Sequence, residues 1–320
     1  MRQTLYTAVA VLILVLHAAS SSAAAQTTRP VAAIERVVII SIDGGRPDLL
    51  LRGDCPTIRS LMEAGSYTFW ARTTAMSITL PSHTSMLTGV TPNKHGIFWN
   101  DDLPLSEPVY PKFPTVFEVA HTAGYSTAMV AGKIKFKTLD RPGTIDWMWL
   151  PEATVDTNFD TAVADHAAEV LREHNPQLLF VHFPGTDVIG HAKGWGSPEQ
   201  MQEFAVVDHG IGQILRALDE LGLRDHTAVL VTADHGGAGR QHGPDDARSR
   251  HIPWILAGPG IRRNYDLTLT QIDINTEDTF ATACWLLGAP LTRHDIDGKP
   301  IREALENREL LQADAGEQKR

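Results

Sequence analysis

The sequence predicts an α/β fold in which a central, mostly parallel β-sheet carries helices on both faces. Runs of apolar, largely β-branched residues recur along the chain, the clearest being Arg36–Ile42, Leu178–Phe183 and Thr227–Thr232. Such runs, without polar alternation, are typical of strands that are buried on both faces. Helix-compatible stretches lie between them, and strands that alternate with helices favour a parallel sheet.

The remaining elements are predicted in chain order from the same patterns. Shorter strands are expected at residues 126–130 and 253–256, and helices at residues 57–64, 114–123, 161–173, 199–221 and 277–287. No internal repeat interrupts this order, so residues 30–310 are expected to form a single catalytic domain, followed by a flexible polar tail at 311–320. Residues 133–152, which contain Trp147 and Trp149, are expected to be irregular and to shape a pocket together with residues 192–197.

The N-terminus has the pattern of an export signal at residues 1–25. Arg2 supplies a positive start, residues 8–16 are almost wholly apolar, and Ala23-Ala24-Ala25 forms an A-x-A cleavage site before Gln26. An uncleaved membrane anchor is the alternative, but the apolar run is shorter than the ~20 residues that span a bilayer. We therefore expect an exported protein, periplasmic or secreted, with no stable membrane span after cleavage.

The net charge of −10 disfavours a nucleic-acid polymer as partner, because a polyanion would be repelled. A small anionic substrate remains compatible with this charge, since bound cations dominate the local field of a site. An exported protein can form disulfides, but Cys284 lies in the apolar run 281–287 and is expected to be a buried free thiol. Whether it pairs with Cys55, and the oligomeric state, stay open.

Potential metal ligands follow three of the expected strands. In open α/β sheets, ligands bind beyond the carboxyl ends of the strands, so these side chains should converge on one edge. A lone Asp there commonly caps a helix, and a lone His is commonly a core or surface residue. Several carboxylates at one edge, however, would repel one another unless cations neutralise them. Mixed Asp and His ligation suits zinc better than magnesium or calcium. The candidate ligands are Asp43, Asp187, His191, Asp234, His235 and His242.

Thr79 is the candidate nucleophile. The segment that follows it becomes helix-compatible, and Pro81 fits just inside a helix start. Thr79 would then lie at a helix N-terminus, where backbone N–H groups favour a phosphoryl group. Metal coordination can activate a Thr hydroxyl. The alternative, that Thr79 or Ser82 is only a helix cap, has equal weight at this point.

A set of short motifs gives the sequence a family resemblance. They are Asp43-Gly, Thr79-x-Pro-x-His, Thr88-Gly, His95-Gly-Ile, Asn100, Asp187-x3-His191, Thr232-Ala-Asp-His-Gly-Gly and His242-Gly. Together they resemble the alkaline phosphatase superfamily, and within it the nucleotide pyrophosphatase/phosphodiesterase branch. The resemblance extends over about residues 36–303.

The resemblance implies roles for individual positions. One divalent metal, most simply Zn²⁺, would be held by Asp43, Thr79, Asp234 and His235, and a second by Asp187, His191 and His242. Asn100 would donate a hydrogen bond to a nonbridging phosphate oxygen, and His83 would be structural. The implied reaction is hydrolysis of a small phosphate ester through a covalent phospho-threonine intermediate.

Some residues differ from the pattern of this branch, so alternative functions stay open. The branch often has Phe-Pro-Asn-His after the nucleophile, whereas this chain has Leu80-Pro-Ser-His83. Lys133 and Lys135 occupy a region in which monoesterases of the superfamily bind phosphate charge, although two solvated lysines would fit as well. A phosphomonoesterase or phosphonate hydrolase is therefore one alternative, and a non-catalytic metal-binding envelope protein is another. Sulfatases of the superfamily have other residues at the positions of Thr79 and His83, which disfavours a sulfatase. His251 is a rival to His242 as a metal ligand.

Overall fold

The computed structural model describes residues 28–101, 109–152, 159–243, 245–291 and 293–306. The predicted signal peptide at 1–25 and tail at 311–320 lie outside this part of the chain and stay predictions. None of the helices in these ranges combines the length and the apolar character that crossing a bilayer requires.

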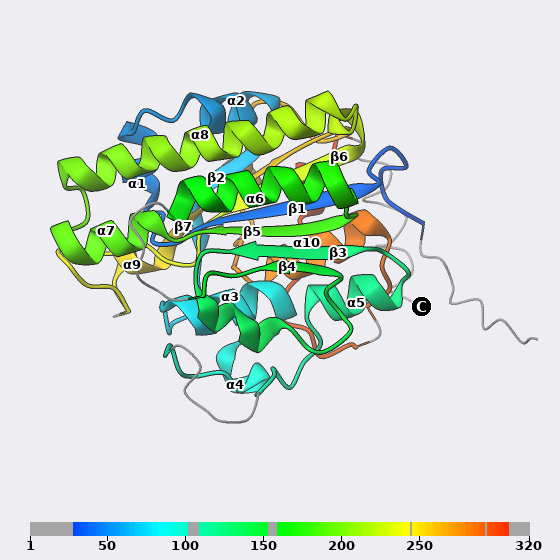
Figure 1. Cartoon of the computed structure of the whole chain (residues 1–320), viewed down its shortest axis with the longest axis horizontal. Helices are drawn as coiled ribbons and strands as arrows, with labels where there is room; N and C mark the ends of the chain where they lie inside the picture. Colours follow the sequence, from blue (N-terminus) through cyan, green and yellow to red (C-terminus); the bar gives the residue numbers. More distant parts are fainter. Residues whose placement is uncertain (1–27, 102–108, 153–158, 244, 292, 307–320) are drawn as a thin grey trace, which may run out of the picture.

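A single sheet organises the described residues (Figure 1). Its eight strands lie in the order β4-β3-β5-β1-β6-β7-β2-β8, and only β7 runs antiparallel to its neighbours. The predicted mostly parallel sheet is confirmed. The strands are β1 Arg36–Ile42, β2 Gly65–Arg72, β3 Thr127–Ala131, β4 Trp147–Trp149, β5 Leu178–Phe183, β6 Thr227–Thr232, β7 His251–Ala257 and β8 Tyr265–Asp266.

Helices cover both faces of the sheet, as predicted. One apolar core packs under α1, α2, α6 and α8, and the other lies between the sheet and α3, α5 and α10 (Figure 1). The helices are α1 Pro47–Arg52, α2 Pro56–Ala64, α3 Thr79–Thr88, α4 Pro92–His95, α5 Val116–Thr122, α6 Phe159–His174, α7 Gly185–Lys193, α8 Pro198–Glu220, α9 Ala247–Arg250 and α10 Asp278–Leu287.

The segment at 133–152 differs from its prediction. It forms a 3₁₀ helix, Ile134–Leu139, and then the edge strand β4. Trp147 stacks on His174 and Trp149 stacks on His166, so both indoles cover α6 instead of capping a pocket. The physical reason is that large aromatic surfaces at a sheet edge are stabilised by burial against the neighbouring helix. The two cysteines are buried free thiols, as expected for Cys284.

Candidate metal centre and nucleophile

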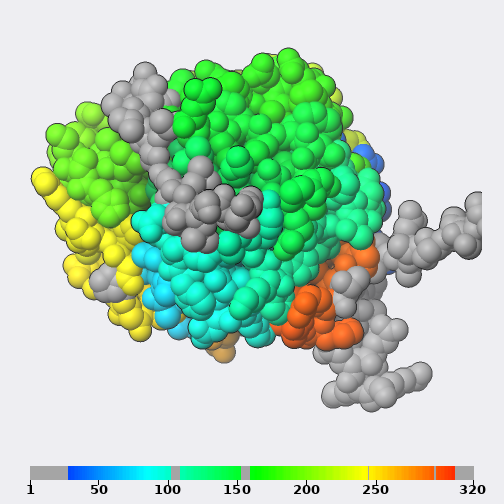
Figure 2. All heavy atoms as spheres, turned by 60° about the horizontal axis from the view of Figure 1, so that its bottom comes forward, coloured from blue at the N-terminus to red at the C-terminus, as the bar shows by residue number. Residues whose placement is uncertain are grey.

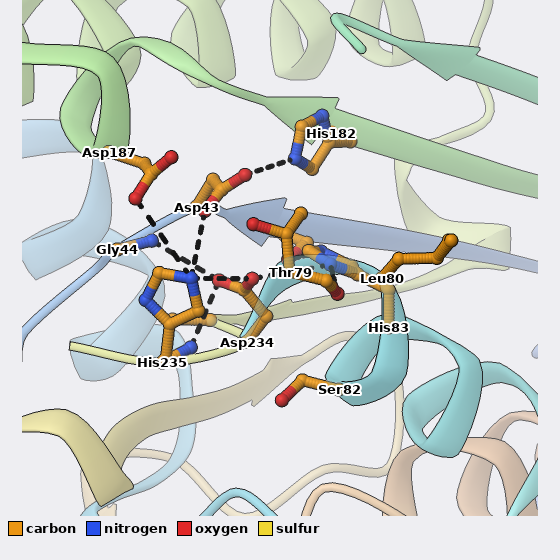
Figure 3. Close-up of polar contacts among 12 residues, drawn as sticks. Asp43, Gly44, Thr79, Leu80, Ser82, His83, His182, Asp187, Asp234 and His235 are labelled. Carbon is orange, nitrogen blue, oxygen red and sulfur yellow. Dashed lines mark hydrogen bonds and ion pairs between the residues drawn. The ribbon is translucent and has the colours of Figure 1, made fainter. Parts of the chain in front are cut away.

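Three adjacent parallel strands bring the predicted ligands together. Ser41 of β1 lies opposite His182 of β5 and Thr232 of β6, so these strands end at the same level. Asp43 follows β1, Asp187 lies in the first turn of α7 after β5, and Asp234 follows β6. All three carboxylates are at most 4% exposed. The convergence predicted from the strand ends is therefore present (Figure 3).

The ligand atoms form two overlapping groups. His235 Nε2 lies 3.3 Å from Asp43 Oδ1 and 3.2 Å from Asp234 Oδ2, which defines the first group. The second group consists of Asp187, His235 and His242, with His242 Nε2 3.5 Å from Asp187 Oδ1. His191 Nε2 lies 3.4 Å from the same Asp187 oxygen. The first group contains three residues of the first predicted set, and the second contains Asp187 and His242 of the second set together with His235. His191 belongs to neither group.

Several ligand atoms in these groups are buried without a hydrogen-bond partner. They are Asp43 Oδ1, Asp187 Oδ1, Asp234 Oδ2 and His235 Nε2. Buried polar atoms of folded proteins almost always have a partner, so four unpartnered atoms facing one another form a candidate site for a cation. A mixed set of carboxylate oxygens and imidazole nitrogens is the donor set that zinc and similar metals prefer. The residues present therefore fit divalent metal ions.

The histidines of the site are oriented by main-chain carbonyl groups. His235 Nδ1 is 2.9 Å from Gly236 O, and His242 Nδ1 is 2.9 Å from Ser77 O. His191 Nδ1 makes the equivalent contact, 3.0 Å long, with Arg240 O. A ring that donates its Nδ1–H to a carbonyl leaves Nε2 unprotonated for a metal. Burial and the neighbouring His242 lower the pKa of His235 to about 4, which keeps this ring neutral.

The carboxylates of the first group have opposite electrostatic environments. Burial, reinforced by Asp43 and Asp187, holds the pKa of Asp234 well above its ordinary value. Burial alone would also raise the pKa of Asp43, but the Lys133 cation and the hydrogen bond from His182 outweigh it and hold that pKa well below the usual range. The negative charge of the first group is thus concentrated on Asp43, next to Lys133, as repulsion between buried carboxylates requires.

Lys133 and Lys135 are buried beside the site. Lys133 Nζ donates to Asp43 Oδ2 at 2.6 Å and to Asp187 Oδ2 at 2.7 Å. Lys135 donates to the main-chain carbonyl of Asn100. Their exposed fractions are 6% and 8%, so the alternative of two solvated lysines is wrong. Lys133, predicted to bind substrate, contacts carboxylates of both ligand groups instead.

Thr79 is the first residue of α3 and is 1% exposed. The residue at the N-cap position is Ile78, so the alternative that Thr79 or Ser82 caps this helix is wrong. Thr79 faces the carboxylates of Asp43 and Asp234 (Figure 3). Asn100 Oδ1 accepts a hydrogen bond of 2.9 Å from the N–H of Leu80, which anchors its amide at the same helix N-terminus. A hydroxyl, an amide donor and a helix N-terminus are thereby gathered where an anion binds favourably.

His182 is a site residue that the sequence interpretation missed. It lies fully buried within β5, and its Nε2 is 3.0 Å from Asp43 Oδ2. The one sequence signal is a single His in the apolar run Leu178–Phe183. His83, interpreted as structural, has its Nδ1 2.8 Å from the carbonyl oxygen of Thr79 and its Nε2 2.8 Å from the Ser41 hydroxyl. These contacts fit the structural interpretation.

Trp195 closes one side of the second ligand group. Its indole lies 5.2 Å from the His191 ring and 5.8 Å from the His242 ring, and its Nε1–H donates to Gly44 O. Gly44 has a φ of 72°, which favours glycine at this close approach. His251, the rival ligand, starts β7 and contacts the Trp70 ring, and it belongs to neither ligand group.

Comparison with known proteins places this geometry in a family. Residues 37–246 match the family described as type I phosphodiesterase / nucleotide pyrophosphatase. An uncharacterised pyrophosphatase/phosphodiesterase of Schizosaccharomyces pombe is 28% identical over 63% of this chain and 44% of its own length. The mouse bis(5′-adenosyl)-triphosphatase is 26% identical over 63% of this chain and 47% of its own length. The chain thus spans less than half the length of these relatives.

A solved structure shows the same fold. Murine ectonucleotide pyrophosphatase/phosphodiesterase 5, solved as an inactive variant in complex with AMP, aligns with a TM-score of 0.68 at 16% identity. The alignment covers 85% of this chain and all of the murine chain. The resemblance to the alkaline phosphatase superfamily is confirmed, and the chain belongs to its type I phosphodiesterase / nucleotide pyrophosphatase family.

Proposed function

We propose that this chain is an exported two-metal hydrolase of small phosphate esters, of the phosphodiesterase or nucleotide pyrophosphatase type. The observation that carries the proposal is the set of four unpartnered, buried ligand atoms beside a buried Thr79 at a helix N-terminus. The family supports the chemistry, and the pattern of residues 1–25 supports export.

The ligand groups support a division of the site residues between two divalent ions, most simply zinc. Asp43, Thr79, Asp234 and His235 would hold one ion, and Asp187, His191 and His242 would hold the other. When bound, such ions neutralise the carboxylates and the phosphate and make the hydroxyl more acidic. The Nδ1 contacts of the histidines support this assignment, because they leave Nε2 free.

The residues of the chain then perform the reaction in two displacements. The Thr79 oxygen forms a bond to phosphorus while the bond from phosphorus to the alcohol oxygen breaks, and the alcohol takes up the proton that Thr79 releases. Water next attacks the phospho-threonine, which restores the Thr79 hydroxyl and releases the phosphate group. The Asn100 amide and the N–H groups of the first turn of α3 stabilise the negative charge of the phosphoryl oxygens.

A second candidate, a phosphomonoesterase or phosphonate hydrolase, is favoured by the two buried lysines. A monoester carries one more negative charge than a diester, and buried cations next to Asn100 and the ligand groups would compensate it. Lys133→Ala should selectively lower monoester turnover if this candidate holds.

The test uses the full chain, loaded with zinc, and nitrophenyl esters that release the same leaving group. We expect hydrolysis of the diester, loss of activity with chelator, and loss of nearly all turnover in Thr79→Ala with metal content largely retained. Thr161→Ala, at an exposed threonine, is the matched control. A faster monoester reaction would favour the second candidate. Metal binding without turnover of any ester would favour the non-catalytic metal-binding protein instead.

A further inference from the structure

A pocket of about 740 Å³ is lined by residues that adjoin the candidate site residues along the chain. Pockets for small molecules have volumes of roughly 300–1,000 Å³. Three of its lining residues adjoin site residues in the sequence: Met76 precedes Thr79 by three positions, Phe98 precedes Asn100 by two, and Gly243 follows His242. The contact between His242 Nδ1 and Ser77 O joins two of these segments. The pocket therefore shares its walls with the segments that carry the nucleophile and a ligand.

Segments far apart in the sequence meet around this pocket. Figure 2 shows the cyan surface of the α3–α4 region bordered by the yellow segment that leads into α9 and by the orange C-terminal segment. The apolar lining includes Met76, Pro92 and the half-exposed ring of Phe98. The polar lining includes Arg250, Asn275 and Glu277. A ligand with a carbon skeleton and a polar end complements these two kinds of surface.

Glu277 distinguishes the polar side of the pocket. It is 7% exposed, and no ion pair of its carboxylate is found among the described residues. Arg250, which lines the same pocket, donates to Asp245 Oδ1 at 2.7 Å and to the Thr73 carbonyl at 3.1 Å. Asp297, also in the lining, pairs with Lys94 and accepts from the Thr91 N–H. Arg250 and Asp297 thus have ion-pair partners of their own. Arg250 is close enough to Glu277 to oppose the rise of its pKa, but it forms no ion pair with this carboxylate.

Burying a carboxylate without an ion pair is costly, and the pKa of Glu277 reflects this cost. Burial raises the pKa of Glu277 to about 7. An ammonium or hydroxyl group of a ligand would supply a donor in addition to the backbone N–H of Glu277 and, in the case of ammonium, a compensating charge. A ligand that is anionic at this end would be repelled.

We propose that the pocket receives the alcohol part of the substrate and that Glu277 selects alcohols that carry an amino or hydroxyl donor. The inference rests on the proposed hydrolase function and names the substrate class of the same site. The carbon chain of the alcohol lies against Met76 and Phe98, and its donor reaches the Glu277 carboxylate. Amino alcohols and polyols share this chemistry, and the experiment separates them.

The test measures binding to the zinc-loaded Thr79→Ala full chain, so that it does not depend on turnover. The ligands are propyl phosphate, 3-aminopropyl phosphate, 2,3-dihydroxypropyl phosphate and inorganic phosphate, compared by calorimetry. We expect at least one donor ester to bind about tenfold more tightly than propyl phosphate. In Glu277→Gln this ratio should fall close to one, whereas Glu63→Gln, at an exposed carboxylate, should keep it.

A second variant protects the test against a folding defect in Glu277→Gln. Phe98→Ala, at an exposed ring, should weaken all three esters about three- to tenfold relative to inorganic phosphate. A preference for the aminopropyl ester identifies amino alcohols, and a preference for the dihydroxypropyl ester identifies polyols. Equal affinities for the three esters, or a ratio that survives in Glu277→Gln, would overturn the inference. If phosphate esters are still hydrolysed in that case, the proposed function stands without it. If no phosphate ester is bound or hydrolysed, both proposals fail.

Discussion

The ammonium group of Lys133 lies 2.7 Å from Oδ2 of Asp187 and donates a hydrogen bond to it. The same group reaches Asp43 Oδ2, so one buried cation connects the two ligand groups. The Oδ1 atom of each carboxylate remains without a partner. Lys133 therefore neutralises the carboxylates from one side and leaves their other oxygens available for metal ions.

Replacing Lys133 by Met should destabilise the metal-free protein much more than the zinc-loaded protein. Removal of one partner from a buried ion pair costs about 3–5 kcal/mol, because the remaining charges are left uncompensated. Zinc supplies positive charge to the same carboxylates, so it should restore most of the lost stability. Thermal unfolding with chelator and with excess zinc measures both effects. Lys193→Met, on an exposed position of α7, serves as the control. An equal loss in both states would show that Lys133 contributes only packing.

Replacing His182 by Ala should weaken zinc binding by about 10–100-fold, because the ring holds the Asp43 carboxylate in place. His182→Gln can still donate a hydrogen bond and should lose less. Competition with a chromophoric chelator gives the affinity independently of activity. His166→Ala is the matched control at a partly exposed position. Unchanged zinc affinity in His182→Ala would contradict a positioning role.

Replacing Asn100 by Ala should lower kcat/KM by about 100-fold, the usual effect of losing one donor to a developing anion. Asn100→Asp should be worse, because a carboxylate would repel the phosphate. The Oδ1 contact with the Leu80 N–H would survive in Asn100→Asp, which separates the loss of the donor from a shift of the helix N-terminus. Steady-state kinetics on a nitrophenyl diester, with metal content measured in parallel, checks both variants. Near-normal activity in Asn100→Asp, with a loss confined to Asn100→Ala, would indicate a purely structural role.

Replacing Glu277 by Gln should flatten the pH dependence of stability between pH 5 and pH 8. The folded-state pKa is raised from 4.5 to about 7, chiefly by burial, with Asp278 and Asp297 adding to the shift and Arg250 opposing it. A carboxyl with a raised pKa stabilises the fold below its unfolded value, and this contribution is lost as the pH rises through the folded value. The shift corresponds to about 3 kcal/mol. The wild-type Tm should therefore fall more between pH 5 and pH 8 than the Tm of Glu277→Gln. Parallel curves for the two proteins would contradict the raised pKa.

Sequence patterns predicted the sheet best where the strands are buried on both faces. β1, β5 and β6 consist almost wholly of apolar residues, and their bounds match the predicted runs. β2 was missed because its exposure changes along the strand, from buried Ser66 to the largely exposed Trp70, which leaves neither a continuous apolar run nor a strict alternation. Its pairing with β7 is also antiparallel and irregular between Thr68 and Ala71.

The residues of the candidate site likewise differ in how well the sequence predicts them. Asp43, Asp187 and Asp234 could be predicted to converge because each follows a recognisable strand. His182 could not, since its contact with Asp43 depends on the register of β5 against β1. Lys133 was predicted to lie in the site, but its position between two carboxylates depends on β3 packing next to β5, a neighbour relation that chain order does not contain.

The rings of His191, His235 and His242 each contact a main-chain carbonyl group, so the path of the backbone fixes their orientation. The rings contact the main-chain carbonyl groups of Ser77, Gly236 and Arg240 and not side chains, so exchange of the Ser77 or Arg240 side chain should leave the rings in place. The length of the loop between residues 236 and 242 should matter more. Deletion of a single residue there would displace two acceptors at once, the carbonyl groups of Gly236 and Arg240. Metal selectivity in this protein is therefore expected to tolerate local sequence drift and to be sensitive to insertions and deletions.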